Sequence, residues 1–212
     1  MIENCPLCKY HDIRHFIRDA RRDYFQCARC ALVFVPPPQH LPEETEKAQY
    51  DLHENSPDDP SYRAFLSRLM LPMLERIGQD SKGLDFGCGP GPTLSLMFEE
   101  HGHKVRLYDK YYADDVDALS EQYDFISCTE VVEHLKRPGE TFAILLDALK
   151  AGGYLGLMTK FVIDKVAFST WHYKNDPTHI CFYSHETIRH YFQKRECKVD
   201  FVGADVVIIR KG

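Results

Sequence analysis

The 212-residue sequence lacks any run of 18 or more apolar residues, so we expect no membrane-spanning helix. Its first fifteen residues contain no apolar stretch of the kind that marks a secretory signal, and we therefore expect a cytoplasmic protein. Positive charge is in the minority, because 26 Lys and Arg stand against 32 Asp and Glu. The formal net charge of −6 argues against a protein that binds phosphate backbones, so a nucleic acid partner is not expected.

Internal repeats and low-complexity tracts are also absent, and the hydrophobic fraction of 44% excludes wholesale disorder. The length suits one domain of ordinary size with a small appendage. Charge is distributed unevenly between them. Residues 1–40 carry six basic and four acidic side chains, a net charge of +2, whereas residues 41–212 carry twenty and twenty-eight, a net charge of −8.

Cysteines are grouped in a way that indicates a metal site. Two Cys-x-x-Cys pairs, Cys5/Cys8 and Cys27/Cys30, are separated by eighteen residues, and four further cysteines are scattered singly. A secreted disulfide scaffold would be smaller and richer in cysteine. Paired knuckles at this spacing predict one structural zinc ion held by four thiolates.

We expect residues 1–35 to form a zinc-binding module with short strands at 24–27 and 31–35. Three prolines end it, and the acidic residues 36–60 are predicted to be a linker with a short helix near 43–52. A segment this small needs the metal to fold, because zinc contributes roughly 10 kcal/mol or more. Since the prolines separate the module from the rest, replacing Cys27 with serine should unfold the module alone.

Residues 61–212 alternate between helical and strand patterns, which predicts an α/β domain with a mainly parallel, Rossmann-like sheet and helices on both faces. The expected helices are 62–77, kinked or split at Pro72, then 93–100, 140–150 ended by Gly152-Gly153, and 184–193 with Ser184 as its N-cap. The expected strands are 83–86, 104–108, 123–128, 154–159, 198–204 and 206–209.

A glycine-rich turn follows the first of these strands, in the segment LDFGCGPG at 84–91. It lacks the Gly-Lys-Ser/Thr of a P-loop and misses the dinucleotide spacing GxGxxG. Asp109 ends the second strand, eighteen residues after Gly91, where a carboxylate can accept both hydroxyls of a ribose. Taken alone, Asp109 could equally be a solvated turn residue.

These motifs together resemble the class I S-adenosylmethionine-dependent methyltransferases. The segments that carry the resemblance are LDFGCGPG (84–91), VRLYD (105–109), YDFISCTEVVEH (123–134) and LKAGGYLGL (149–157). The similarity is strongest to the branch that contains ubiquinone-biosynthesis-like O-methyltransferases. A zinc module ahead of such a domain also resembles bacterial methyltransferases of secondary metabolism and surface sugars. The resemblance implies S-adenosylmethionine as cofactor and a small-molecule acceptor, with oxygen as the expected acceptor atom.

The resemblance also implies roles for individual residues. Asp85 would face the amino end of the methionine moiety, Asp109 would hold the ribose, and Tyr108 would lie beside the adenosine. The expected cofactor-binding residues are Asp85, Gly87, Cys88, Gly89, Tyr108, Asp109, Asp117, Thr129, Glu130 and Val131.

One feature departs from the family layout. Only thirteen residues separate Asp109 from Tyr123, where the family usually has a helix, a strand and another helix. That unit is lost or shortened here. Asp117 resembles a remnant of the adenine-contacting motif, so the adenine pocket is the least defined part of the expected site.

Histidines are the candidates for a general base that removes a proton from the acceptor. His179 and His172 lie in a polar, aromatic loop at 168–183, after the fourth strand, where open α/β sheets place binding loops. His134 is expected at i+4 from Glu130 on one helical turn, pointing to the pocket or packing at a helix end. His179 is the first candidate, and the rate should then rise with pH near roughly 6.5. A metal held by His172, Asp176 and His179 is a weaker alternative.

Two other functions stay open at this point. An RNA base methyltransferase could grip RNA with the arginines of the zinc module, which are Arg14, Arg18, Arg21, Arg22 and Arg29. A non-catalytic S-adenosylmethionine-binding protein would account for the shortened segment after Asp109. The sequence contains no signal for the oligomeric state.

Overall fold

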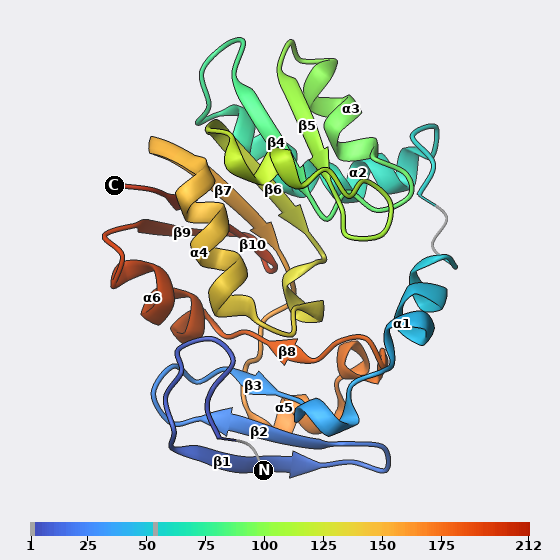
Figure 1. The fold of residues 1–212 in the computed structure, drawn as a ribbon, viewed down its shortest axis with the longest axis vertical. Coiled ribbons are helices and arrows are strands. Elements are labelled where there is room, and N and C mark those ends of the chain that lie inside the picture. Colours follow the sequence, from blue (N-terminus) through green and yellow to red (C-terminus); the bar gives the residue numbers. More distant parts are fainter. Residues whose placement is uncertain (1–2, 53–54) are drawn as a thin grey trace.

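The computed structural model describes residues 3–52 and 55–212, which form two sheets with helices around them (Figure 1). The larger sheet contains β4 (Lys82–Phe86), β5 (Lys104–Tyr108), β6 (Tyr123–Thr129), β7 (Leu149–Met158), β9 (Lys198–Val202) and β10 (Val206–Arg210). The smaller sheet contains β1 (Ile13–Arg18), β2 (Asp23–Cys27), β3 (Val33–Phe34) and β8 (Cys181–Phe182). The α-helices are α1 (Glu43–Tyr50), α2 (Pro60–Leu74), α3 (Thr93–Glu99), α4 (Pro138–Ala148), α5 (Lys165–Thr170) and α6 (His185–Gln193).

The larger sheet has the strand order β5-β4-β6-β7-β10-β9. The pairs β4/β5, β4/β6 and β6/β7 are parallel, whereas β7/β10 and β10/β9 are antiparallel. The sheet is thus mainly parallel, as predicted. The carboxyl ends of β4, β5, β6 and β7 meet at one edge, and the smaller sheet lies beyond that edge (Figure 1).

Helices cover both faces of the larger sheet, because side chains alternate along each strand. On β6, Phe125 packs into a core with α2 and α3, while its neighbour Ile126 joins the core under α4. The same alternation separates Ile208 from Val207 on β10. Within the described residues, no helix has the length and apolarity needed to cross a bilayer.

Two predicted element boundaries are wrong. Helix α2 continues through Pro72, so the proline does not split it, and it ends at Leu74 and not at the predicted residue 77. Gly152 and Gly153 do not terminate a helix, because α4 already ends at Ala148 and strand β7 begins at Leu149. The backbone of Gly152 has φ +75°, and the register of β7 against β6 shifts near this end of the strand. The glycine pair therefore accommodates an irregularity inside the strand.

The shortened segment after Asp109 is confirmed. Residues 110–122, all of them described, contain the 3-10 helix η2 (Val116–Ser120) and no strand, so β5 is the edge of the sheet. Arg106 on β5 pairs with Asp115 and Glu121, which flank η2. These ion pairs hold the short connection against the edge strand.

The small sheet joins two segments that are far apart in the sequence. Strand β3 pairs with β8 in antiparallel register, Val33 against Phe182 and Phe34 against Cys181. Buried side chains of residues 5–35 and of the larger sheet belong to one continuous core. The expectation that the prolines isolate residues 1–35 is therefore wrong, because the sheet of the N-terminal segment is completed by β8, which lies far along the sequence.

The segment predicted as a linker contains α1, which confirms the short helix expected there, and the 3-10 helix η1 (Pro37–Gln39); residues 53–54 lie outside the described part of the chain. Helix α1 lies against the larger domain. The ring of Tyr50 is 5.3 Å from that of His134, and Lys136 lies 2.8 Å from Glu46. The predicted linker thus borders the carboxyl edge of the sheet.

Candidate active site and four-cysteine cluster

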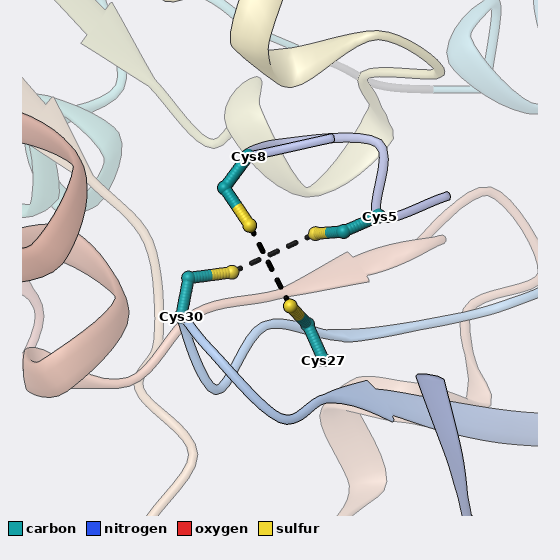
Figure 2. A group of neighbouring side chains, drawn as sticks. All are labelled: Cys5, Cys8, Cys27 and Cys30. Carbon is teal, nitrogen blue, oxygen red and sulfur yellow. Dashed lines mark hydrogen bonds between the residues drawn. The ribbon is translucent and has the colours of Figure 1, made fainter. Parts of the chain in front are cut away.

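The four knuckle cysteines converge at one point (Figure 2). The Sγ atoms of Cys5 and Cys30 are 3.6 Å apart, and those of Cys8 and Cys27 are 3.5 Å apart. Four thiolates around one zinc ion, each at about 2.3 Å, would be about 3.8 Å from one another. The cluster therefore has the ligand type and spacing of a tetrahedral zinc site.

The two knuckles have the same backbone geometry. In the first, the amide of Cys5 donates to the carbonyl five residues ahead and its carbonyl accepts from Lys9; in the second, Cys27 and Ala31 repeat both bonds. Lys9 and Ala31 have φ of 60° and 58°, a left-handed conformation that side chains other than glycine adopt at a cost. Two strained turns of this kind in equivalent places indicate a backbone arranged around a ligand.

The thiols also differ in acidity. A hydrogen bond from Cys30 lowers the pKa of Cys5 to about 6, whereas burial raises the pKa of Cys8 to about 11. A zinc ion bound by the four sulfur atoms would hold all of them as thiolates.

The other functional region contains the glycine-rich turn that follows β4. Gly87 and Gly89 have φ of 78° and 65°, conformations that favour glycine. A Cβ atom on Gly87 would lie 2.3 Å from a methyl group of Val131, so this position also needs glycine for space. The turn after β4 therefore packs directly on the residues that follow β6.

Asp85 lies beneath this turn, with only 4% of its surface exposed. Its carboxylate accepts a 2.8 Å hydrogen bond from the Ser127 hydroxyl on β6. Burial raises the pKa of Asp85 to about 6, and the charge of Asp109 adds to the shift. Asp85 therefore places a buried carboxyl group near the carboxyl end of β4.

Asp109 supports the turn from the neighbouring strand. One carboxylate oxygen accepts from the Gly89 amide at 3.0 Å, and the other accepts from the amides of Tyr111 and Tyr112 at 2.8 and 3.2 Å. Tyr108 stacks on Phe86, with 5.2 Å between the ring centres. The Asp109 carboxylate thus lies at the point where β4 and β5 both end.

Two of the residues predicted near the cofactor, Asp117 and Cys88, are less informative. Asp117 lies exposed on η2. Cys88 is buried, and burial raises the pKa of its thiol to about 12, so it is a neutral thiol in the turn.

The end of β6 contains polar atoms without partners. The hydroxyl oxygen of Thr129 and one carboxylate oxygen of Glu130 are buried and have no hydrogen-bond partner among the described residues. Glu130 has φ +52°, and the following 3-10 helix, η3, spans only Val132–His134. The expected i+4 relation of Glu130 and His134 on one helical turn is therefore wrong, because the backbone turns sharply at Glu130.

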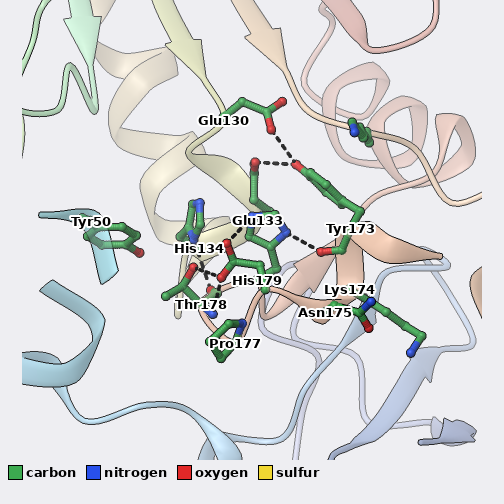
Figure 3. Close-up of polar contacts among 12 residues, drawn as sticks. Tyr50, Glu130, Glu133, His134, Tyr173, Lys174, Asn175, Pro177, Thr178 and His179 are labelled. Atoms are coloured by element: carbon green, nitrogen blue, oxygen red, sulfur yellow. Dashed lines mark hydrogen bonds and ion pairs between the residues drawn. The ribbon is translucent and has the colours of Figure 1, made fainter. Parts of the chain in front are cut away.

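Tyr173 connects this end of β6 to the loop after β7 (Figure 3). Its hydroxyl donates to the carboxylate of Glu133, and it lies 3.3 Å from Glu130 and 3.2 Å from the Thr159 hydroxyl. Burial, together with the charge of Glu130, raises the pKa of Glu133 to about 8. The sequence analysis missed both Glu133 and Tyr173, although a second glutamate beside His134 was a visible signal.

Two of the three candidate histidines come together, and one does not. The rings of His134 and His179 are 4.7 Å apart at their centres. Burial lowers the pKa of His179, opposed by the charge of Asp176. His172 is exposed and faces Lys160 at 3.3 Å. A metal site of His172, Asp176 and His179 is therefore not assembled in the described structure.

The region predicted as a loop at 168–183 is ordered by the N-terminal segment. It contains the end of α5, the 3-10 helix η4 (His172–Asn175) and β8, which the sequence analysis did not predict. The guanidinium group of Arg22, 8% exposed, donates to four backbone carbonyls at 2.5–3.0 Å. These carbonyls belong to Lys174, Asp176, Pro177 and His179.

An ion pair strengthens the same contact. The ammonium group of Lys174 is buried and lies 2.7 Å from Asp19, next to the β1–β2 turn. Through Arg22 and Asp19, the N-terminal segment therefore holds the backbone of the segment that contains His179.

A family model described as a methyltransferase domain matches residues 60–200, which is more than half of the chain. The chain belongs to this methyltransferase family. The matched residues include the glycine-rich turn, the end of β6 and the segment of Tyr173 and His179.

Among curated relatives, the methyltransferase is 30% identical over 86 residues to a ubiquinone biosynthesis O-methyltransferase of Shewanella pealeana. That match covers 41% of this chain and only 36% of the relative. A second such enzyme, from Pectobacterium atrosepticum, is 29% identical over 91 residues, covering 43% of this chain and 38% of the relative.

Solved structures share the fold. The 1,6-didemethyltoxoflavin N1-methyltransferase of Burkholderia thailandensis, solved with 1,6-didemethyltoxoflavin and S-adenosylhomocysteine, has a TM-score of 0.57 and 12% identity. The similarity covers 93% of this chain and 99% of that one. At this identity the likeness establishes the architecture of the methyltransferase and not its substrate.

Proposed function

We propose that this protein transfers a methyl group from S-adenosylmethionine to an oxygen atom of a small molecule. The observation that carries the proposal is the carboxyl edge of the sheet in a chain of the methyltransferase family. There the glycine-rich turn packs on Val131 just after β6, Asp109 accepts from the Gly89 amide, and oxygens of Thr129 and Glu130 are buried without a partner among the described residues. The O-methyltransferases among the curated relatives support oxygen as the acceptor atom.

The residues at this edge fit the cofactor. Gly87 and Gly89 allow its close approach, and the Asp109 carboxylate can accept the hydroxyls of a ribose. Asp85 would hold the amino end of the methionine moiety through its buried carboxyl group. The unpartnered atoms at the end of β6 would gain polar partners on binding, which removes a desolvation cost.

We expect the acceptor to lie near Glu130 and Tyr173, next to the pair His134 and His179. In the reaction the acceptor oxygen forms a bond to the methyl carbon, the bond from that carbon to sulfur breaks, and sulfur keeps the electron pair. The protein aligns the two reactants and excludes water. A base near the acceptor takes the hydroxyl proton, and His179 is the first candidate.

We also propose that the four-cysteine cluster binds structural zinc. The sulfur spacing, the two equivalent knuckles and the lowered pKa of Cys5 support this proposal. All four positions of a tetrahedral ion would be taken by thiolates, so the metal would stabilise the fold without touching substrate.

Replacing Asp109 with alanine should weaken binding of S-adenosylhomocysteine by about 1–3 kcal/mol, because charge-assisted hydrogen bonds to the ribose are lost. Asp109→Asn separates two effects, since the amide oxygen can still accept from the loop amides. Isothermal calorimetry measures both variants, with the exposed Asp114→Asn as control. Equal affinity of wild type and Asp109→Ala would show that the ribose is held elsewhere.

Replacing His179 with alanine should lower kcat by about 10²–10⁴-fold and leave cofactor affinity nearly unchanged. If His179 is the base, its neutral form is active, so the wild-type rate rises with pH to a plateau. Because burial lowers the pKa of His179, the midpoint should fall below roughly 6.5. A variant with full turnover would remove His179 from the mechanism; lost thermal stability with an unchanged pH profile would indicate a bracing role.

The RNA hypothesis receives little support from the module. Arg22 is buried against backbone carbonyls, and Arg21 donates to another carbonyl of the same segment. Arg14 and Arg18 pair with nearby aspartates, while Arg29 lies 3.7 Å over a tyrosine ring. Arg21 and Arg22 are thus bound to the protein's own backbone, whereas Arg14 and Arg18 form exposed surface pairs.

One experiment separates the three functions. Methyl transfer from labelled S-adenosylmethionine is measured over a panel of phenols, sugars and total RNA. Label on a phenol or sugar supports the proposal, and label on RNA alone would replace it. Tight cofactor binding without transfer to any acceptor would favour a non-catalytic protein.

A further inference from the structure

Lys160 lies two residues after the end of β7, at the carboxyl edge of the sheet. The side chain is partly buried, and its ammonium nitrogen lies 5.3 Å from the centre of the Tyr173 ring, whose hydroxyl is 3.3 Å from Glu130 (Figure 3). Burial raises the pKa of Glu130 and lowers that of His179, and in both groups the charge of Lys160 shifts the pKa downward. Lys160 therefore acts on the region where we expect the acceptor.

Lys160 differs from other cations around this edge in its lack of a carboxylate partner. Three of those cations form ion pairs, which are Arg68 with Asp205, Lys136 with Glu46 and Lys174 with Asp19. Within residues 3–52 and 55–212, the ammonium group of Lys160 forms no ion pair. A partly buried ammonium group has lost some of its hydration, and an anion offsets this cost most directly. The edge thus contains one positive charge that an anionic ligand can neutralise.

His172 orients this ammonium group. Nζ of Lys160 lies 3.3 Å from Nε2 of His172, and because an ammonium nitrogen only donates, Nε2 is the acceptor. One of the three N–H groups is used in this bond, and two remain for a ligand. The ring of Trp171 adjoins that of Tyr173, with 5.0 Å between their centres. Aromatic surface therefore lies close to the unpaired cation.

We propose that Lys160 binds a carboxylate group of the methyl acceptor, so that the acceptor is a small hydroxy acid; this inference rests on the proposed function. One unpaired ammonium group balances the single negative charge of a carboxylate, whereas a phosphate group carries about −1.5 to −2. Its two remaining N–H groups also match the two oxygens of a carboxylate. Burial raises the pKa of Glu133 to about 8, so this neighbouring group is largely protonated at neutral pH and does not repel an anion.

The test uses the full chain saturated with S-adenosylhomocysteine, and probes that differ in one group. 3,4-Dihydroxybenzoate carries a carboxylate, and 4-methylcatechol is its neutral counterpart; glucuronate and glucose form a second, non-aromatic pair. Calorimetry measures each Kd. Quenching of the fluorescence of Trp171, the only tryptophan in the sequence, shows whether the ligand binds beside Tyr173. Wild type should bind at least one of the acids about tenfold or more tightly than its neutral counterpart.

Lys160→Met removes the charge and keeps the length of the side chain. It should weaken binding of that acid about tenfold or more, and change binding of the neutral counterpart by less than about twofold. Lys160→Arg keeps the charge in a different geometry and should recover part of the affinity. The control is Lys198→Met, because Lys198 is exposed and lies opposite Arg210, away from the carboxyl edge. It should bind both probes like wild type.

An affinity for S-adenosylhomocysteine equal to that of wild type shows that Lys160→Met is folded. Equal binding of the acid by wild type and Lys160→Met, or no binding of either acid by wild type at millimolar concentration, would overturn the inference. Binding that depends on Lys160, without methyl transfer to any acceptor, would support the carboxylate site and count against the proposed function. Methyl transfer to neutral acceptors only, unchanged in Lys160→Met, would support the proposed function and overturn the inference.

Discussion

Replacing Cys27 with serine is expected to abolish zinc binding and to reduce methyl transfer to background, although Cys27 is remote from the cofactor residues. Structural zinc contributes roughly 10–16 kcal/mol, which is as large as the total stability of an ordinary domain. Without it the β1–β2–β3 segment should lose its fold. Strand β8 then loses its partner β3, and the segment that holds His179 loses the contacts of Arg22.

Three measurements check this expectation: zinc content by elemental analysis, the Tm, and turnover. Cys197→Ala serves as the control, because it removes a buried cysteine outside the knuckles and should cost only about 1 kcal/mol. Full turnover in the Cys27 variant, with unfolding confined to residues 1–35, would contradict the coupling that the shared sheet implies. Zinc-free wild-type protein of normal stability would contradict the zinc site itself.

Replacing Arg22 with alanine is expected to destabilise the protein by about 3–5 kcal/mol, since each buried carbonyl left without a partner costs about 1–3 kcal/mol and some can be rehydrated. Turnover should fall by about 10²-fold, because a small displacement of a catalytic group has an effect of this size. Binding of S-adenosylhomocysteine should change little, since Arg22 contacts none of the cofactor residues.

The neighbouring Arg21 is a matched control. It is exposed and donates to a single carbonyl, that of Asn175, so Arg21→Ala should be nearly neutral. Arg22→Lys preserves the charge but supplies fewer donors in a different geometry, and should rescue only part of the loss. If Arg22→Ala retains wild-type turnover, positioning of the His179 segment by the N-terminal segment is not needed for the reaction.

Local features of the fold could be predicted because their causes are local. Ser184 was expected to cap α6, and it accepts from the Thr187 amide at 3.1 Å in a capping box. The glycine-rich turn was placed between β4 and the next helix, where the structure has Gly87 and Gly89 with positive φ. The strand and helix pattern also located every strand of the larger sheet, although β7 begins at Leu149 and not at the predicted residue 154.

The unpredicted features depend on contacts between distant residues. Strand β8 has only two residues, and nothing nearby marks it as a strand until β3 pairs with it. The environment of Glu133 depends on Tyr173, forty residues later. The role of Arg22 depends on carbonyl groups, which leave no trace in the sequence. Pairings of this kind are set by tertiary packing and not by propensity.

The pairing of β3 with β8 also has a consequence for the order of folding. During synthesis the first three strands emerge well before residue 181. The small sheet can therefore be completed only after β8 has been made and can pair with β3. Long sequence separation makes such a contact slow to form, and an unpaired strand edge is prone to aggregation in the interval. A metal bound early by the two knuckles would keep the nascent hairpin folded while the rest of the chain is still being made.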